Sequence, residues 1–140
     1  MLVKEVMTKN IVTIDADKSV YDASDLLREK KIGSVIVLDK EGEVGLVTKR
    51  DIIGGTILAH KNPETTTVSE IMRTNLITVH PMENIQNAVE LMGKNKIRKL
   101  IVVKDKVILG IITVTDISRA TKDIIKRVMA TSFLEETEAY

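Results

Sequence analysis

The chain has 140 residues, of which 44% are hydrophobic and 29% charged, and its 21 basic and 20 acidic residues leave a formal net charge of +1. This is the composition of a globular domain, and the balanced charge gives no electrostatic reason to expect nucleic acid or an anionic membrane as the main partner. The absence of cysteine excludes disulfides, thiolate metal sites and thiol catalysis. No apolar run approaches about 18 residues and charges follow the first residues directly, so we expect no membrane span, no signal peptide and a cytoplasmic location.

The chain is expected to contain two similar units in tandem, because its sequence repeats at a fixed offset. Residues 3–53 align with residues 68–118 without a gap, and 15 of these 51 positions are identical. The segment GLVTKRD at 45–51 returns as GIITVTD at 110–116. A duplication this regular indicates one structural unit built twice, and such units normally pair to bury faces that neither could bury alone. Any site built by one copy should therefore have a counterpart in the other.

Each copy has the pattern strand, helix, strand, strand, helix. In the first copy Ser19 is placed to cap the first helix, and the continuous apolar run at 35–38 is typical of a strand buried on both faces. The expected strands cover residues 11–14, 35–38 and 44–47 in the first copy and 76–79, 100–103 and 107–112 in the second. The helix of the second copy is expected from about residue 85 to residue 94.

The repeat also predicts the domain boundaries. We expect a first unit over 1–60, an exposed linker over 61–67, a second unit over 68–130 and an acidic, frayed tail over 131–140. The last helix should be longer than its counterpart in the first copy, since its apolar spacing continues beyond the repeat. Gly54 and Gly55 lie in a helix-like segment and are expected to permit close packing.

The ordered set of repeated motifs resembles a tandem pair of CBS domains, often called a Bateman module. The match is carried by the opening segments 3–7 and 68–72, by a threonine in each first strand, by an alanine in each first helix, and by the two Gly-h-h-Thr-x-x-Asp segments, where h is apolar. The resemblance implies an α/β fold (an α+β sandwich) of two pseudo-symmetric βαββα units packed through their sheets. It also implies clefts between the units that often bind adenosine-containing ligands, and frequent dimerisation.

The Thr-x-x-Asp segments allow two compatible interpretations. One is a capping box, in which Thr48 or Thr113 caps a helix and the aspartate reaches back to a free backbone N–H. The other is a ligand site, because a strand that ends at a helix N-terminus suits phosphate, and a carboxylate there can accept both hydrogen bonds of a ribose diol. The resemblance places the family's ribose-binding aspartate at Asp51 and Asp116, and its hydroxyl ligands at Thr48, Thr113 and Thr115.

The two copies differ in charge just before the second strand. The second copy has Arg98 and Lys99 there, where nucleotide-binding relatives contact phosphate; a solvated basic turn is the alternative. The first copy has Gly33 and Ser34 instead, and Lys49 and Arg50 are its only nearby cations by sequence. We therefore expect the stronger phosphate-binding site in the second copy.

The candidate ligand-binding residues come from both copies. In the first they are Thr13, Ile14, Ile32, Val35, Thr48, Arg50 and Asp51; in the second they are Thr78, Val79, Ile97, Arg98, Lys99, Leu100, Thr113, Thr115 and Asp116. The chain has only three aromatic residues, Tyr21, Phe133 and Tyr140, and none lies in an expected strand. A planar ligand would therefore be held between aliphatic side chains.

The expected function is regulatory ligand sensing rather than catalysis. His60 and His80 have no paired carboxylate nearby and are expected at the surface, and neither a glycine-rich phosphate loop nor a metal-binding cluster is present. The predicted ligand is an adenine nucleotide, AMP first and ADP or ATP next, with no cofactor, and a homodimer would signal to an unknown effector protein. The alternatives are a sensor of S-adenosylmethionine or methylthioadenosine, and a structural dimerisation or scaffold module without ligand.

Overall fold

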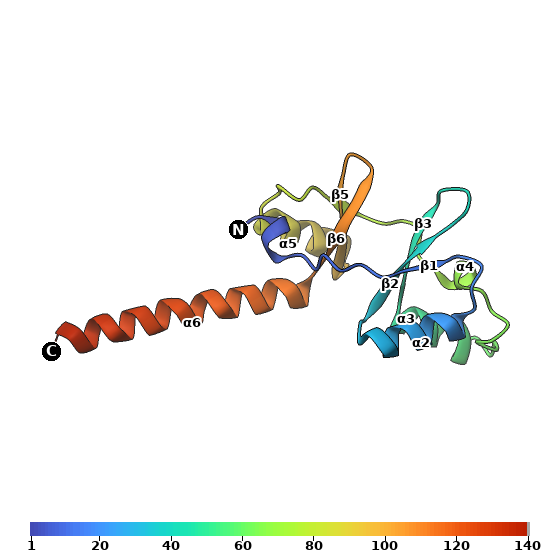
Figure 1. Ribbon diagram of the computed structural model, residues 1–140, viewed down its shortest axis with the longest axis horizontal. Coiled ribbons are helices and arrows are strands. Elements are labelled where there is room, and N and C mark those ends of the chain that lie inside the picture. Colours follow the sequence, from blue (N-terminus) through green and yellow to red (C-terminus); the bar gives the residue numbers. More distant parts are fainter. Residues whose placement is uncertain (140) are drawn as a thin grey trace. The chain divides into compact units, whose positions relative to one another are not determined.

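The computed structural model describes the backbone of residues 1–139 and the side chains of residues 1–131. The chain forms two compact units, each with its own three-stranded sheet (Figure 1). The first unit is Asn10–Leu76, and the second unit combines Met1–Lys9 with Ile77–Tyr140. The mixed α/β class and the presence of two units of similar build, both expected from the repeat, are confirmed.

The first unit is built around a sheet in which β2 is central. Its elements are β1 (Thr13–Asp15), α2 (Val20–Lys30), β2 (Ser34–Leu38), β3 (Val44–Thr48), α3 (Lys49–Ile52), the π-helical η1 (Ile53–Ile57) and α4 (Val68–Ile71). β1 pairs with β2 in parallel and β3 pairs with β2 antiparallel. The parallel pair needs a crossover, which α2 provides. The predicted cap is confirmed, because the Ser19 hydroxyl accepts a hydrogen bond from the Asp22 N–H at 3.0 Å.

The second unit repeats this arrangement. Its elements are α1 (Val3–Val6), β4 (Thr78–Val79), α5 (Ile85–Asn95), β5 (Lys99–Lys104), β6 (Val107–Thr113) and α6 (Val114–Ala139). β5 is central, with β4 parallel and β6 antiparallel to it. The expected extra length of the last helix is confirmed, since α6 runs to Ala139. The acidic segment expected to fray is thus helical in its backbone, and its side chains lie outside the described residues.

Each unit has a hydrophobic core between its sheet and its first long helix. In the first unit this core includes Val35 and Val37 of β2 and Ala23 of α2; all three are fully buried. The expectation that residues 35–38 are buried on both faces is confirmed for 35–37, whereas Leu38 is 40% exposed at the strand end. Leu26 and Leu91 are only partly buried and pack at the margins of the two cores.

The opening segments of the two repeats are exchanged between the units. α4 begins the second repeat, yet Val68 is fully buried in the core of the first unit. α1 begins the first repeat, yet Val3 is fully buried in the core of the second. Each exchanged segment then pairs with a strand edge. Leu46 and Arg73 exchange backbone hydrogen bonds of 2.9 Å, and Thr8 and Ile111 exchange bonds of 2.8 and 3.1 Å.

The segment expected to be an exposed linker is exposed at most of its positions, but hydrogen bonds tie it to the first unit. The Asn62 side chain accepts a hydrogen bond from the Glu64 N–H at 2.9 Å and forms an Asx turn. The Thr66 hydroxyl donates to the Asn62 carbonyl at 2.8 Å, and Thr66 is only 4% exposed. The Thr66 carbonyl accepts a hydrogen bond from the Val20 N–H at the start of α2. The polar residues of this segment therefore form local turns that hold it to the first unit.

Gly55 does permit close packing, since a Cβ on it would collide with the side chain of Ile71, whereas Gly54 faces open space. His60 and His80 are exposed, as expected. No helix within residues 1–139 is long and apolar enough to cross a membrane.

Candidate functional site

The first candidate site lies where β3 ends and α3 begins. Thr48 is the N-cap of α3 and its hydroxyl accepts from the Asp51 N–H at 3.3 Å. In return, Asp51 Oδ2 accepts hydrogen bonds from the Thr48 N–H and hydroxyl, both at 2.9 Å. The predicted capping box is therefore present. It fixes a carboxylate whose side chain is only 8% exposed at the N-terminal end of the helix.

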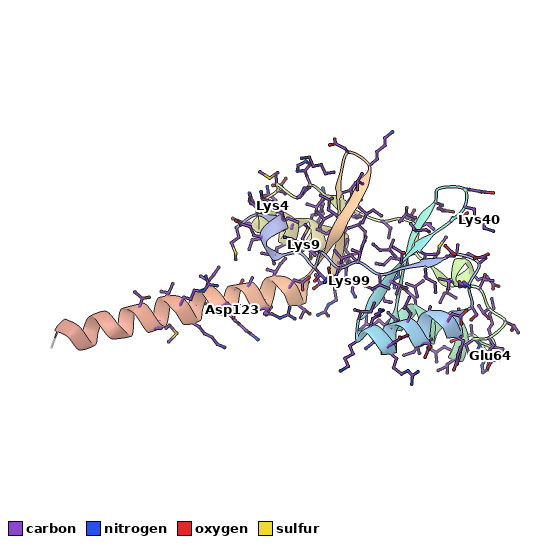
Figure 2. The ribbon with its side chains drawn as sticks, in the orientation of Figure 1. Lys4, Lys9, Lys40, Glu64, Lys99 and Asp123 are labelled. Atoms are coloured by element: carbon purple, nitrogen blue, oxygen red, sulfur yellow. The ribbon has the colours of Figure 1, made fainter. Side chains whose placement is uncertain are left out.

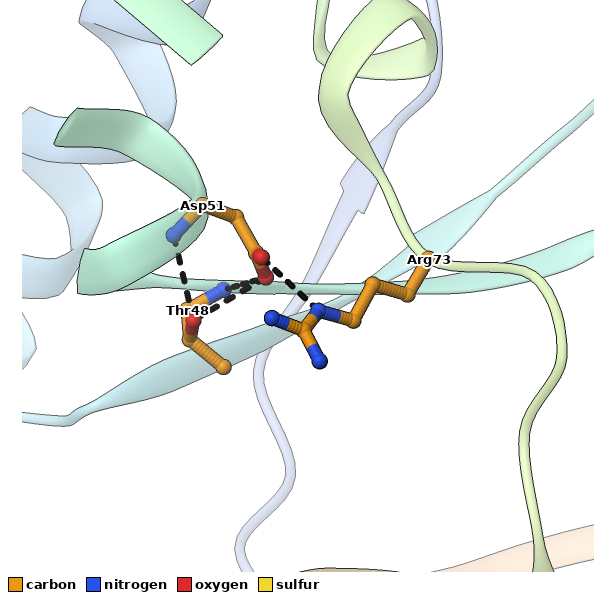
Figure 3. A network of polar contacts seen from close by, with 3 residues as sticks. All are labelled: Thr48, Asp51 and Arg73. Atoms are coloured by element: carbon orange, nitrogen blue, oxygen red, sulfur yellow. Dashed lines mark hydrogen bonds and ion pairs between the residues drawn. The ribbon is translucent and has the colours of Figure 1, made fainter. Parts of the chain in front are cut away.

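A cation from the second repeat reaches this carboxylate. The exchanged segment after α4 places Arg73 beside Asp51, and its Nε donates to Asp51 Oδ1 at 2.8 Å (Figure 3). Asp51 thus accepts hydrogen bonds on both of its oxygens. The expectation that Lys49 and Arg50 are the only nearby cations of the first copy is wrong, because it counted neighbours along the chain and could not include the exchanged segment.

The second candidate site repeats the cap between β6 and α6. The Thr113 N–H donates to Asp116 Oδ2 at 3.0 Å, and the Asp116 N–H donates to the Thr113 hydroxyl at 3.1 Å. Asp116 is buried, at 9% exposure. Its capping box confirms the local interpretation of the second Thr-x-x-Asp segment.

The surroundings of Asp116 are less strongly bonded than those of Asp51. Thr8, which corresponds to Arg73 in the repeat, places its hydroxyl 3.4 and 3.5 Å from the two carboxylate oxygens. These distances are at the outer limit for an O–H···O hydrogen bond. The guanidinium of Arg119 on the same helix lies 3.7 Å from Oδ1. Asp116 therefore keeps more acceptor capacity for a ligand than Asp51 does.

The predicted phosphate-binding pair lies on the strand next to this cap. Lys99 is the first residue of β5 and is the register partner of Thr113, and Figure 2 shows it at this end of the sheet. Arg98 immediately precedes Lys99, and the Arg98 carbonyl accepts a hydrogen bond from the Val114 N–H at 3.0 Å. Arg98 is exposed and Lys99 is partly buried. The unit therefore brings two cations from one end of β5 close to the first turn of α6.

The other candidate residues lie on the same strands or next to them. Thr13 pairs with Ile36 in the first unit, as Thr78 pairs with Ile101 in the second. Each candidate set thus lies within one compact unit. Among the candidates, Val35, Val79 and Leu100 are buried core residues, Ile14, Ile32 and Ile97 are partly buried, and Thr13, Thr78, Arg50 and Thr115 are exposed.

An open hollow of about 380 Å³ lies beside Asp51 in the first unit. It is lined by Arg50, Asp51, Gly54, Gly55, Ala59, Lys61, Glu70, Ile71 and Arg73. Glu70 is the second acid here, and Thr67 donates to it from its N–H at 2.6 Å and from its hydroxyl at 3.1 Å. These bonds, and to a smaller extent the charge of Lys61, hold the pKa of Glu70 below its ordinary value. Both acids of the hollow therefore already have partners.

Arg73, Thr8 and Lys61 were not predicted as site residues. Arg73 and Thr8 can be placed beside the aspartates only once α1 and α4 are known to pack in the opposite copies, and Lys61 lies in the segment expected to be a linker. The repeat offered one indication of these residues, because positions 8 and 73 are equivalent but hold a neutral threonine and a charged arginine. The alignment gives no indication that either residue lies beside the aspartate of the other repeat.

The sequence model of the CBS domain matches residues 3–55 and 68–123, which is most of the chain. The chain therefore belongs to the CBS-domain family, as the repeated motifs indicated. The CBS domain-containing protein YhcV of Bacillus subtilis is 28% identical over 116 residues, covering 83% of this chain and 82% of YhcV. The mitochondrial protein CBSX3 of Arabidopsis thaliana is 34% identical over 110 residues, covering 74% of this chain and 53% of CBSX3.

Solved structures of CBS-domain pairs share the fold. The CBS domain pair of MJ0100, solved with 5′-methylthioadenosine and S-adenosyl-L-methionine, superposes with a TM-score of 0.77 and 30% identity over 88% of this chain and 97% of that chain. The hexameric CBS-CP12 protein of bloom-forming cyanobacteria gives a TM-score of 0.78 and 34% identity over 84% of this chain and 66% of that chain.

Proposed function

We propose that this CBS-domain pair is a regulatory module that senses an adenine nucleotide, with AMP as the first candidate and ADP or ATP next. One observation carries the proposal: the cap of α6 presents the buried carboxylate of Asp116 beside the strand end that bears Arg98 and Lys99. A carboxylate with remaining acceptor capacity suits a ribose diol. A neighbouring pair of cations suits phosphate.

The proposed mechanism is linkage between ligand binding and the conformation that a partner protein recognises. A ligand shifts such an equilibrium only by as much as its affinities for the two conformations differ. The nucleotide would bind through Asp116, with Thr113 and Thr115 at the same turn and the partly buried aliphatic residue Ile97 nearby. The effector is an unidentified protein.

A thermal-shift screen tests the ligand class. We expect AMP, ADP or ATP to raise the melting temperature, because a ligand that binds only the folded state stabilises it; a concentration of 100 times Kd contributes about 2.7 kcal/mol. S-adenosylmethionine and methylthioadenosine are the matched alternatives, favoured by the ligands of the MJ0100 pair. If these two compounds raised the melting temperature and the nucleotides did not, the ligand would be one of these two and not a nucleotide. No shift with any of them would favour a scaffold module, for which the capping boxes need no ligand.

We also propose that the module works as a homodimer formed through exposed apolar helix faces. The described part of α6 carries Ile125, Val128 and Met129 at 51%, 58% and 66% exposure. In the first unit, η1 and the residue after it carry Ile57 and Leu58 at 69% and 70%. Apolar side chains grouped in this way are typical of interaction surfaces. The hexameric CBS-CP12 protein supports self-association.

Light scattering at tens of micromolar should report a dimer, twice the 15.6 kDa of the chain. Replacing Val128 by Glu should shift the protein toward the monomer, because a charge would be placed on the apolar face and would lose its solvation on association. Replacing Arg127 by Glu, on the opposite side of the same helix, is the control and should leave the mass unchanged. A wild-type monomer at this concentration would contradict the proposal.

A further inference from the structure

The two units differ in the residue that the exchanged segment brings to the capping aspartate. In the second unit this residue is Thr8, with its hydroxyl at 3.4 Å from Asp116. In the first unit it is Arg73, with Nε at 2.8 Å from Asp51. Residues 8 and 73 are equivalent in the repeat. One substitution at one repeat position therefore changes the charge beside the site.

Asp51 is engaged on both oxygens before any ligand arrives. Oδ2 accepts two hydrogen bonds from Thr48 and Oδ1 accepts one from Arg73. A ribose diol would have to share or displace these donors. The Arg73 side chain is 62% exposed while the Asp51 side chain is 8% exposed, so Asp51 fixes an arginine that still faces solvent.

The geometry of this pair leaves the rest of the guanidinium available. Nε alone bonds to Asp51 (Figure 3), and the two terminal nitrogens of Arg73 make no hydrogen bond in the part of the chain that the structure describes. Two adjacent N–H groups in this orientation match the oxygens of a phosphate. Asp51 thus orients the guanidinium for an anion without occupying its outer edge.

The hollow beside Arg73 has further positive charge. Arg50 and Lys61 line it, and neither side chain has an ion-pair partner within 4.0 Å among residues 1–131. Glu70 is bonded to Thr67, and Asp51 is bonded to Arg73. An anion entering this hollow would therefore meet cations whose charge is only partly compensated.

We propose that Arg73 makes the first unit a phosphate-selective site, in which it binds the phosphate of a nucleotide while Asp51 serves mainly to position it. Arg50, on the same hollow, is the second cation for that phosphate. The inference rests on the proposed nucleotide-binding function and specifies it. The second unit recognises the ribose through Asp116 as well as the phosphate through Arg98 and Lys99, whereas the first unit recognises mainly the phosphate, through Arg73. The first unit should then favour AMP over adenosine more strongly than the second unit does.

The test exchanges the two repeat-equivalent residues and reads each unit separately by two-dimensional NMR of the full chain. The amides of Thr48 and Asp51 report on the first unit, and those of Thr113 and Asp116 on the second. Arg73→Thr should weaken AMP binding in the first unit at least tenfold and leave adenosine binding there unchanged or stronger. The reciprocal Thr8→Arg should weaken adenosine in the second unit and raise its preference for AMP.

Arg28→Thr is the matched control, because it removes the same charge from an exposed arginine of the first unit that pairs with Asp25 away from the hollow. This variant should bind both AMP and adenosine as the wild-type protein does. If Arg73→Thr weakened both ligands equally, or strengthened both equally, Arg73 would be a packing or blocking residue and the inference would be overturned.

Two further outcomes separate this inference from the proposed function. If AMP shifted the amides of the second unit alone in the wild-type protein, phosphate selection by Arg73 would be overturned while nucleotide sensing would stand. If AMP shifted the amides of neither unit at millimolar concentration, both would be overturned.

Discussion

The Asp116→Ala variant is expected to bind adenosine and AMP about ten- to a hundredfold more weakly than the wild-type protein. The substitution removes the buried carboxylate that would accept hydrogen bonds from the ribose, which both ligands share. A charge-assisted bond of this kind contributes about 1.5–3 kcal/mol. Isothermal titration calorimetry with both ligands measures the change.

Lys99→Ala and Arg98→Ala are the matched comparisons, since they lie beside the same turn but face the phosphate in the proposed mode. These two substitutions should weaken the binding of AMP much more than the binding of adenosine. If all three substitutions weakened both ligands to the same degree, the roles assigned to the carboxylate and the cations would be incorrect. Circular dichroism must accompany the titration, because Asp116 also completes the cap of α6 and loss of a capping interaction costs about 1 kcal/mol.

The Gly110→Ala variant is expected to lose about 2 kcal/mol of unfolding free energy. A Cβ at this position of β6 would lie 2.5 Å from the Thr8 carbonyl oxygen and 3.1 Å from Met7 Sδ. Backbone cannot turn aside as a side chain can, so the exchanged segment would have to move away from the strand. That movement would strain the two hydrogen bonds between Thr8 and Ile111, and overpacking of this kind typically costs about 1–3 kcal/mol.

Two other alanine substitutions provide controls for this prediction. At the repeat-equivalent Gly45 the new Cβ would approach Met72, with Sδ at 2.5 Å; a flexible side chain can rearrange, so the loss should be smaller. At Gly93, on the exposed face of α5, nothing lies within 4 Å, and alanine should stabilise the helix by about 0.5–1 kcal/mol. Urea unfolding should rank the variants in this order. If the Gly110 variant were no less stable than the Gly45 variant, displacing the Thr8 backbone would cost no more than rearranging the Met72 side chain, and the prediction would fail.

Much of the local structure could be predicted because it depends on short stretches of sequence. Apolar runs and their spacing predicted the central strands β2 and β5 and the helices α2 and α5. The Thr-x-x-Asp spacing predicted both capping boxes, since a cap involves only a residue and its neighbours three positions on. The polar composition of 61–67 correctly indicated exposure at most of its positions, but it did not show that Asn62 and Thr66 form a turn bound to the first unit.

The sequence alone therefore determined the duplication, the class of fold, the family and the two aspartates at strand-to-helix turns. The tertiary structure decided which copy each opening segment joins, and hence that Arg73 lies beside Asp51 and Thr8 beside Asp116. A one-turn helix such as α1 or α4 has too few internal hydrogen bonds to be stable alone, so its position depends on where Val3 or Val68 can be buried. That choice is a long-range packing decision, and no periodicity within one repeat encodes it.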